Sequence, residues 1–192
     1  MGGAIMRKLL LFCFVAFVCA GCVDVPLLDS QATVDPGEGY FVMGVTPHNL
    51  KVAIWSGDVE NGRFVQIGSL NRPPYANTPL DGYIVGQTHG KEAVAIWYIE
   101  FKTEDNSRYT GQAFVPCQDT KTYVIQIPPG KVVYMGDANF GIGDGGAYSS
   151  SGYDFEKARD FMKTHYPNLA NRLETGHYQR LPTDRGGNCN IE

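Results

Sequence analysis

The sequence is short of basic residues and lacks any long hydrophobic run. Its 192 residues include 16 Lys and Arg against 20 Asp and Glu, a net charge of −4 with neutral histidines. Nucleic-acid binding needs a basic stripe, and adsorption to an anionic lipid surface needs clustered basic residues. We therefore expect no nucleic acid as a partner. The longest apolar run, residues 9–19, is too short for the roughly 20 residues of a membrane-spanning helix.

Recognisable catalytic and metal-binding motifs are also missing. The sequence has no Gly-x-Ser-x-Gly nucleophile elbow, no Cys-x-x-Cys pair and no histidines at ligand spacing. Its histidines are interpreted as ordinary surface or helix-end residues; they are His48, His89, His165 and His177. We expect no catalytic residue, no metal and no cofactor. Because catalytic triads are defined by geometry rather than by spacing, a hydrolase stays open as an alternative.

The first residues have the layout of a secretory signal peptide. A basic start and the short apolar run are followed by Ala20 and Gly21, which stand directly before Cys22. Small residues against a cysteine make this segment similar to the signal peptides of bacterial lipoproteins. The resemblance implies that residues 1–21 are removed and that Cys22 becomes the first residue, with a lipid on its sulfur.

The same resemblance implies where the mature protein lives. Two or more acyl chains give stable anchoring, so the membrane is an expected partner through the N-terminal lipid. The residue after Cys22 is Val23 rather than an aspartate, which in this class implies the outer membrane and a domain that faces the periplasm. Residues 22–38 have no sustained apolar period, and we interpret them as a tether. A secreted protein with a cleaved signal and no lipid is the alternative.

Two cysteines of the expected mature chain remain, Cys117 and Cys189. An oxidising compartment favours a disulfide bond between them. On the chain-entropy model, closing so long a loop would contribute up to about 4 kcal/mol of stability. Two free, buried thiols are the alternative.

Residues 39–192 have patterns typical of β-strands, and we interpret them as one β-rich domain. The expected strands are 40–45, 51–55, 64–67, 83–86, 93–101 and 109–115, with a hairpin over 122–135. The strand 93–101 is apolar on both alternations, which predicts a central strand buried on both faces. The hairpin turns at Pro129 and Gly130, because a type II turn needs a residue with positive φ at its third position.

The hydrophobic period changes near the C-terminus. Apolar residues recur at helical spacing from Phe155 to Tyr166, which predicts an amphipathic helix capped by Asp154 or Ser151. A second short helix is expected over residues 169–174. Together the segments predict a mainly β fold, a β-sandwich or partly open barrel with one or two C-terminal α-helices.

The Gly-rich segment 136–146 is the most conspicuous loop candidate. A calcium loop counted from Asp137 needs glycine at its sixth position and glutamate at its twelfth, where the sequence has Ile142 and Tyr148. A phosphate-binding loop would need a following Gly-Lys-Ser/Thr. We therefore interpret the segment as a flexible connection between the last strand and the helix.

A second loop candidate is rich in proline and contains an aromatic residue. Three prolines remove donors for a strand ladder, which favours a loop over residues 72–79. An aromatic residue in an exposed loop can anchor a partner. The candidate interaction loop consists of Pro73, Pro74, Tyr75 and Pro79.

These observations favour a non-enzymatic function at the cell envelope. The first hypothesis is a lipid-anchored binding or interaction module in the periplasm that binds another envelope protein or a glycan. Its tether would strengthen weak binding by raising the local concentration. The alternatives are a lipid-anchored immunity or inhibitor protein and an envelope hydrolase, which would show a deep pocket with convergent polar groups.

Overall fold

The structure is a computed structural model. It describes residues 27–67, 75–90, 92–102, 109–114, 116, 121–143 and 146–184. The expected signal peptide, Cys22, Cys117 and Cys189 lie outside these residues. In the described part of the chain, no helix has both the length and the apolar composition needed to cross a membrane.

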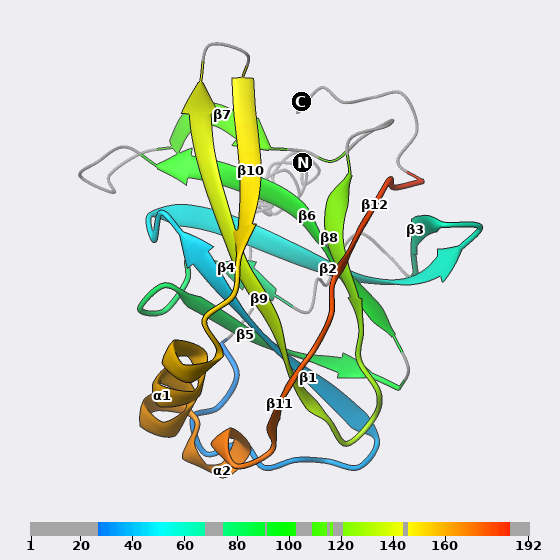
Figure 1. The fold of residues 1–192 in the computed structure, drawn as a ribbon, viewed down its shortest axis with the longest axis vertical. Helices are drawn as coiled ribbons and strands as arrows, with labels where there is room; N and C mark the ends of the chain where they lie inside the picture. The colour runs from blue at the N-terminus through cyan, green and yellow to red at the C-terminus, as the bar shows by residue number, and fades with distance from the viewer. Residues whose placement is uncertain are drawn as a thin grey trace, which may run out of the picture.

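Two β-sheets form the body of the molecule (Figure 1). The first contains β1 (Glu38–Thr46), β5 (Tyr83–His89), β9 (Val132–Gly143), β10 (Gly146–Gly152) and β11 (Leu173–Thr175). The second contains β2 (Leu50–Glu60), β3 (Arg63–Gln66), β4 (Tyr75–Asn77), β6 (Ala93–Lys102), β7 (Tyr109–Phe114), β8 (Thr122–Gln126) and β12 (Gln179–Leu181). The helices are α1 (Phe155–His165) and α2 (Pro167–Ala170). The mainly β fold with C-terminal helices is therefore confirmed.

The strand order explains which elements are neighbours. The first sheet runs β10-β9-β1-β5, with β11 also paired to β9. The second runs β12-β8-β6-β2-β3, with β4 paired to β2 and β7 paired to β6. Most pairs are antiparallel, but β9 is parallel both to β1 and to β11.

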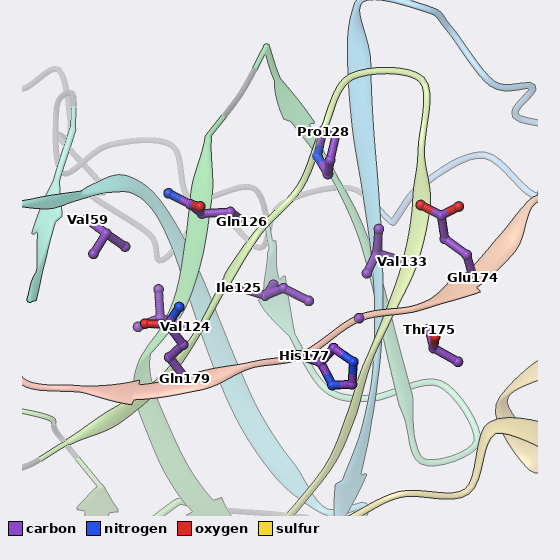
Figure 2. Close-up of a pocket in the computed structure, with 11 residues that line it drawn as sticks. Val59, Val124, Ile125, Gln126, Pro128, Val133, Glu174, Thr175, His177 and Gln179 are labelled. Atoms are coloured by element: carbon purple, nitrogen blue, oxygen red, sulfur yellow. The ribbon is translucent and has the colours of Figure 1, made fainter.

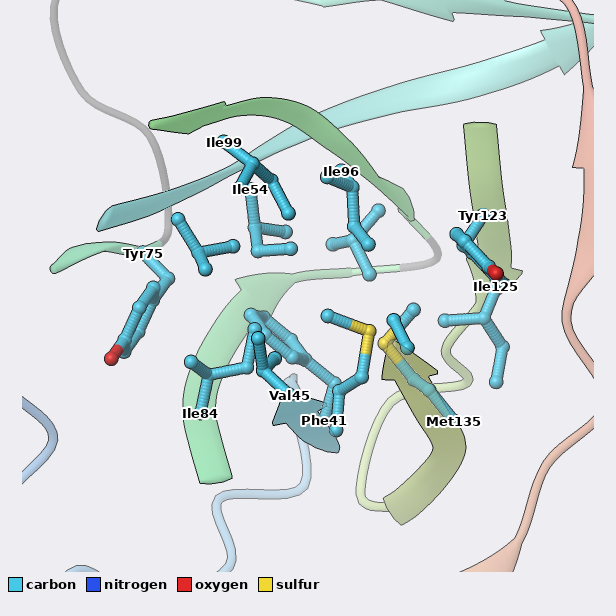
Figure 3. Close-up of a cluster of buried hydrophobic side chains, with 14 of the residues drawn as sticks. Phe41, Val45, Ile54, Tyr75, Ile84, Ile96, Ile99, Tyr123, Ile125 and Met135 are labelled. Atoms are coloured by element: carbon cyan, nitrogen blue, oxygen red, sulfur yellow. The ribbon is translucent and has the colours of Figure 1, made fainter. Parts of the chain in front are cut away.

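The main hydrophobic core lies between the two sheets. Successive strand residues point to opposite faces, and Phe41 and Val45 of β1 point toward the second sheet. There they face Ile54 of β2 and Ile96 of β6, all fully or almost fully buried (Figure 3). Burying side chains of this size contributes about 1.5–3 kcal/mol each, so this layer holds the sheets together.

The helices cover the outer face of the first sheet. The alternate residues of β1, Tyr40 and Val42, pack in one cluster with Phe161 and Met162 of α1. The predicted amphipathic helix is confirmed, and its N-cap is Asp154, whose carboxylate accepts from the Lys157 amide at 3.1 Å.

The predicted central strand, β6, is confirmed as buried on both faces. Ile96 and Ile99 belong to the layer between the sheets, whereas Ala95 and Trp97 lie in a separate cluster. In that cluster the rings of Trp97 and Trp55 are 6.4 Å apart. The second sheet therefore has a small core of its own on its other face.

The predicted hairpin over residues 122–135 is wrong in its pairing. Its turn exists, since Gly130 has a φ of +74° and the Lys131 amide donates to the Pro128 carbonyl. The strands on either side, however, join different sheets: β8 pairs with β6 and β12, whereas β9 pairs with β1, β10 and β11. A turn sequence determines the reversal of the chain but not the partner of each strand.

The chain after α2 forms a segment that we call the C-terminal strap, residues 173–184. It pairs first with β9 as β11 and then with β8 as β12. Thr183 then bridges Phe64 of β3, at the far edge of the second sheet. The strap therefore joins both sheets and both edges of the second one (Figure 1).

The strap and β10 correct two further expectations. The second helix ends at Ala170, and Leu173–Thr175 is a strand rather than helix. The Gly-rich segment is not a flexible connection where the structure describes it. Most of it belongs to β9 and β10, which pair from Gly143 with Gly146 to Asp137 with Gly152.

Candidate functional site

A polar cleft of about 190 Å³ lies where the first sheet meets the start of α1. Its lining side chains come from four separate parts of the chain: the end of β1, the turn before β5, the strands β9 and β10, and α1. The lining residues are Gly44, Val45, Thr46, His48, Asp81, Gly82, Tyr83, Asp137, Asn139, Gly152, Asp154 and Lys157.

A β-bulge in β9 aims two polar side chains into this cleft. Val42 pairs with Tyr134, but Gly44 pairs with Asp137, so β9 has one residue more than β1 between these pairs. The extra residue falls at Gly136, whose φ is +94°. The bulge resets the alternation of β9, and Asp137 and the second residue after it, Asn139, line the cleft.

Asp137 occupies space that a glycine leaves open. A Cβ at Gly44 would lie 2.0 Å from its Oδ1. That oxygen accepts a 2.6 Å hydrogen bond from the Tyr134 hydroxyl, and Oδ2 accepts from the Asp154 amide at 3.1 Å. Neutral donors therefore fix the carboxylate between the sheet and the helix start.

Asp154 connects the start of α1 to the sheet. Its own carboxylate caps α1 by accepting from the Lys157 amide, while its amide is held by Asp137 and by the Tyr134 hydroxyl oxygen at 3.1 Å. These hydrogen bonds join β9 to α1 through side chains. Lys157, on the first turn of α1, also lines the cleft.

The opposite wall is the turn between β4 and β5. Asp81 and Gly82 both have positive φ, as a type I′ turn requires, and Leu80 and Tyr83 exchange two 2.8 Å backbone hydrogen bonds around them. The imidazole of His48 lies directly on Gly82, since a Cβ there would be 2.5 Å from its Nε2. Only glycine leaves this space at position 82.

A second histidine fixes the same turn from the helix side. Nε2 of His165, at the end of α1, lies 3.0 Å from Oδ2 of Asp81, and its ring contacts that of Phe161 in a tilted arrangement, with centroids 4.6 Å apart. The turn and the helix thus contact each other through an ion pair when His165 is protonated.

Two tyrosines at the cleft keep their protons. Burial, followed by the negative charges of Asp137 and Asp154, raises the pKa of Tyr83 to about 12. Burial and the hydrogen bond to Asp137 raise the pKa of Tyr134 further. The Tyr134 hydroxyl is therefore a permanent donor to Asp137 at physiological pH.

A second, more open depression of about 700 Å³ shares lining residues with the cleft. Thr46 and His48 line both hollows, while Thr78 and Lys102 line the depression alone. His48 thus stands at the junction of two adjoining hollows.

A separate groove of about 300 Å³ lies along the C-terminal strap (Figure 2). Glu174, His177 and Gln179 of the strap rim it, and Val124 and Val133 line it from β8 and β9. Gly176 packs so closely that a Cβ would lie 2.3 Å from Val133 and 2.5 Å from Ile125. The groove is the seam along which the strap is attached, whereas the cleft also contains polar side chains that join no elements, those of His48, Asn139 and Lys157.

The structure corrects the role expected for Tyr75. Its side chain is only 3% exposed and lies in the core between the sheets, with its hydroxyl donating to the Thr78 carbonyl at 2.8 Å (Figure 3). Burial raises the pKa of that hydroxyl above its ordinary value. Pro79 is also buried, while Pro73 and Pro74 lie outside the described residues. Tyr75 is therefore a core residue rather than an exposed anchor.

The sequence singles out some residues of the cleft, but nothing in it predicts that they lie together. Asp154 was identified as a helix cap and Asp137 as the start of a rejected calcium loop. His48 was treated as a surface histidine, and Asn139 and Lys157 carried no signal. Among the described residues, no group of three or more His, Cys, Asp or Glu side chains is placed to hold a metal ion.

In comparisons with known proteins, no family model, no curated protein and no solved structure matches the chain.

Proposed function

We propose that this protein is a lipid-anchored binding module of the cell envelope, tethered through Cys22, that binds an envelope component in the polar cleft. The observation that carries the proposal is the convergence of His48, Asn139 and Lys157, from three distant parts of the chain, on one cavity. Within the described residues these three side chains make no hydrogen bond or ion pair, so they are available to a ligand.

The carboxylates of the cleft support binding more than catalysis. Both oxygens of Asp137 accept from neutral groups of the protein, and Asp154 is used to cap α1. A general acid or base must exchange its proton with substrate. Carboxylates engaged in holding a helix are suited to shaping a site instead.

The experiment is a crosslinked pull-down of the lipidated protein from solubilised envelope, with Cys22→Ser as the anchoring control. We expect the wild type to partition with membranes and to show the added mass of the lipid, and Cys22→Ser to lose both. An unchanged mass and unchanged partitioning of Cys22→Ser would contradict the anchor.

Two matched variants test the site in the same pull-down. Asn139→Ala changes the cleft, and Gln179→Ala changes an exposed residue of the groove along the strap. We expect Asn139→Ala to lose the captured component and Gln179→Ala to keep it. The reverse pattern would move the binding site to the groove.

A further inference from the structure

The polar groups of the cleft include both hydrogen-bond donors and hydrogen-bond acceptors. Asp81 presents a carboxylate acceptor, Lys157 presents only donors, and Asn139 presents both. A hydroxyl group donates one hydrogen bond and accepts two, so a ligand with several neighbouring hydroxyls matches alternating donors and acceptors. A saccharide is such a ligand.

An exposed aromatic ring lies close to these polar groups. Tyr153 is 50% exposed and stands in the chain between two lining residues, Gly152 and Asp154. Its ring lies 5.0 Å from that of Tyr134, whose hydroxyl is bonded to Asp137. The apolar C–H face of a sugar ring packs on an aromatic ring, while its hydroxyls reach adjacent polar groups, and this surface offers both.

The size and shape of the hollows fit a chain of small units. The cleft, at about 190 Å³, is smaller than the roughly 300–1,000 Å³ usual for drug-sized ligands. Thr46 and His48 also line the depression of about 700 Å³. One sugar ring in the cleft would leave the adjoining depression for the next.

The composition of the lining disfavours two other ligand classes. The carboxylates of the cleft, from Asp81, Asp137 and Asp154, outnumber the ammonium groups of Lys157 and, in the depression, Lys102, and this balance disfavours an anionic ligand. Peptides are usually bound by a sheet edge or by apolar pockets. The larger apolar side chains of this lining, Val45 and Tyr83, are themselves buried.

We infer that the cleft and the adjoining depression bind an uncharged saccharide chain, with Asn139 and Lys157 bonding its hydroxyls and Tyr153 packing against a ring. This inference rests on the proposed binding function and narrows its ligand to one chemical class.

The test is calorimetric titration of the full lipidated protein in a detergent without a sugar head group. The probes are chitotetraose and maltotetraose, which are uncharged, and tetragalacturonate, which is anionic. We expect saturable binding of at least one uncharged tetramer, and binding of tetragalacturonate that is weaker by about tenfold or more. Preference for the anionic tetramer, or no binding of either uncharged one at about 10 mM, would overturn the inference.

Variants locate the bound saccharide. Asn139→Ala and Tyr153→Ala should each weaken the binding by about tenfold, and Gln179→Ala should leave it unchanged. Circular dichroism checks that each variant is folded. If Gln179→Ala weakens binding and the other two do not, the saccharide binds elsewhere and the inference is wrong.

Different results would contradict the proposed binding function and the proposed ligand class. If the pull-down captures an envelope component that Asn139→Ala loses, while no saccharide binds, the binding module stands and the ligand class is wrong. If the pull-down captures nothing and Cys22→Ser behaves as the wild type, the proposed function itself fails.

Discussion

The C-terminal strap and the polar cleft show two different ways in which distant parts of this chain are joined. The strap is attached by backbone pairing with β9, β8 and β3, and by glycine packing against Val133. The cleft is held by side-chain hydrogen bonds among Tyr134, Asp137 and Asp154. Backbone pairing requires little of side-chain identity, whereas the cleft depends on particular polar groups. Changes in the strap should therefore alter stability most, changes to the hydrogen-bonded carboxylates of the cleft should alter it less, and changes to Asn139 should alter binding.

The largest effect is expected where the strap is packed most tightly. Gly176→Val places a side chain where even a Cβ would overlap Val133 and Ile125. Overpacking of this kind typically costs 1–3 kcal/mol, and we expect about 3 kcal/mol here because two core side chains must move. Urea unfolding measures the effect. Gln179→Ala, an exposed change in the same strap, is the control, and equal midpoints for the two variants would contradict the role given to the strap.

A smaller effect is expected at the side-chain link of the cleft. Asp154→Ala removes the cap of α1 and should lower the free energy of unfolding by about 1 kcal/mol. Asp154→Asn keeps a capping oxygen and should restore most of that loss. Thermal unfolding of the three proteins distinguishes them. If Asn is as destabilising as Ala, the negative charge rather than the cap is what α1 requires.

The smallest effect is expected at an ion pair outside both regions. The hydrogen bond from His89 to Glu38, at 2.8 Å, and the charge of Glu38 raise the pKa of His89 above 6.5. The folded state therefore binds the proton more tightly than the unfolded state, and the stabilisation is complete below about pH 6.5. It is lost as pH rises through the raised pKa.

Because His89 is largely exposed, this contribution should stay within about 1 kcal/mol and shrink in high salt. The measurement is the urea midpoint of wild type and His89→Gln at pH 5.5 and pH 8.5. We expect the two proteins to differ only at the lower pH. A difference that persists at pH 8.5 would show that the imidazole stabilises the fold without its charge.

The strands could be predicted from the sequence, but their partners could not. Residues 93–101 are rich in β-branched and aromatic side chains, and β6 forms there as a central strand. Pro129 and Gly130 predicted a turn, and the turn forms. The two strands that flank the turn do not pair with each other, because β1, which lies far back in the chain, takes the place beside β9. Long-range pairing of this kind leaves no local trace.

Glycine and proline were the main sources of error. The glycines of segment 136–146 indicate a loop, but the segment belongs mostly to β9 and β10, and Gly136 supplies the positive φ of the bulge. The prolines around Tyr75 indicated an exposed loop, but β4 pairs with β2 there and turns the ring into the core. The cleft itself requires the bulge and the parallel pairing of β1 with β9, so only the structure could bring its residues together.

The position of the strap in the chain has a consequence for biosynthesis. Residues 173–184 supply neighbours of β9, β8 and β3, and they leave the ribosome after all three of these strands. Chains emerge at about 5–20 residues per second, and a domain folds as a unit once its parts are present. Neither sheet of this protein is complete before the strap is made. The two sheets therefore cannot be completed until residues 173–184 have left the ribosome, however early their other strands emerge.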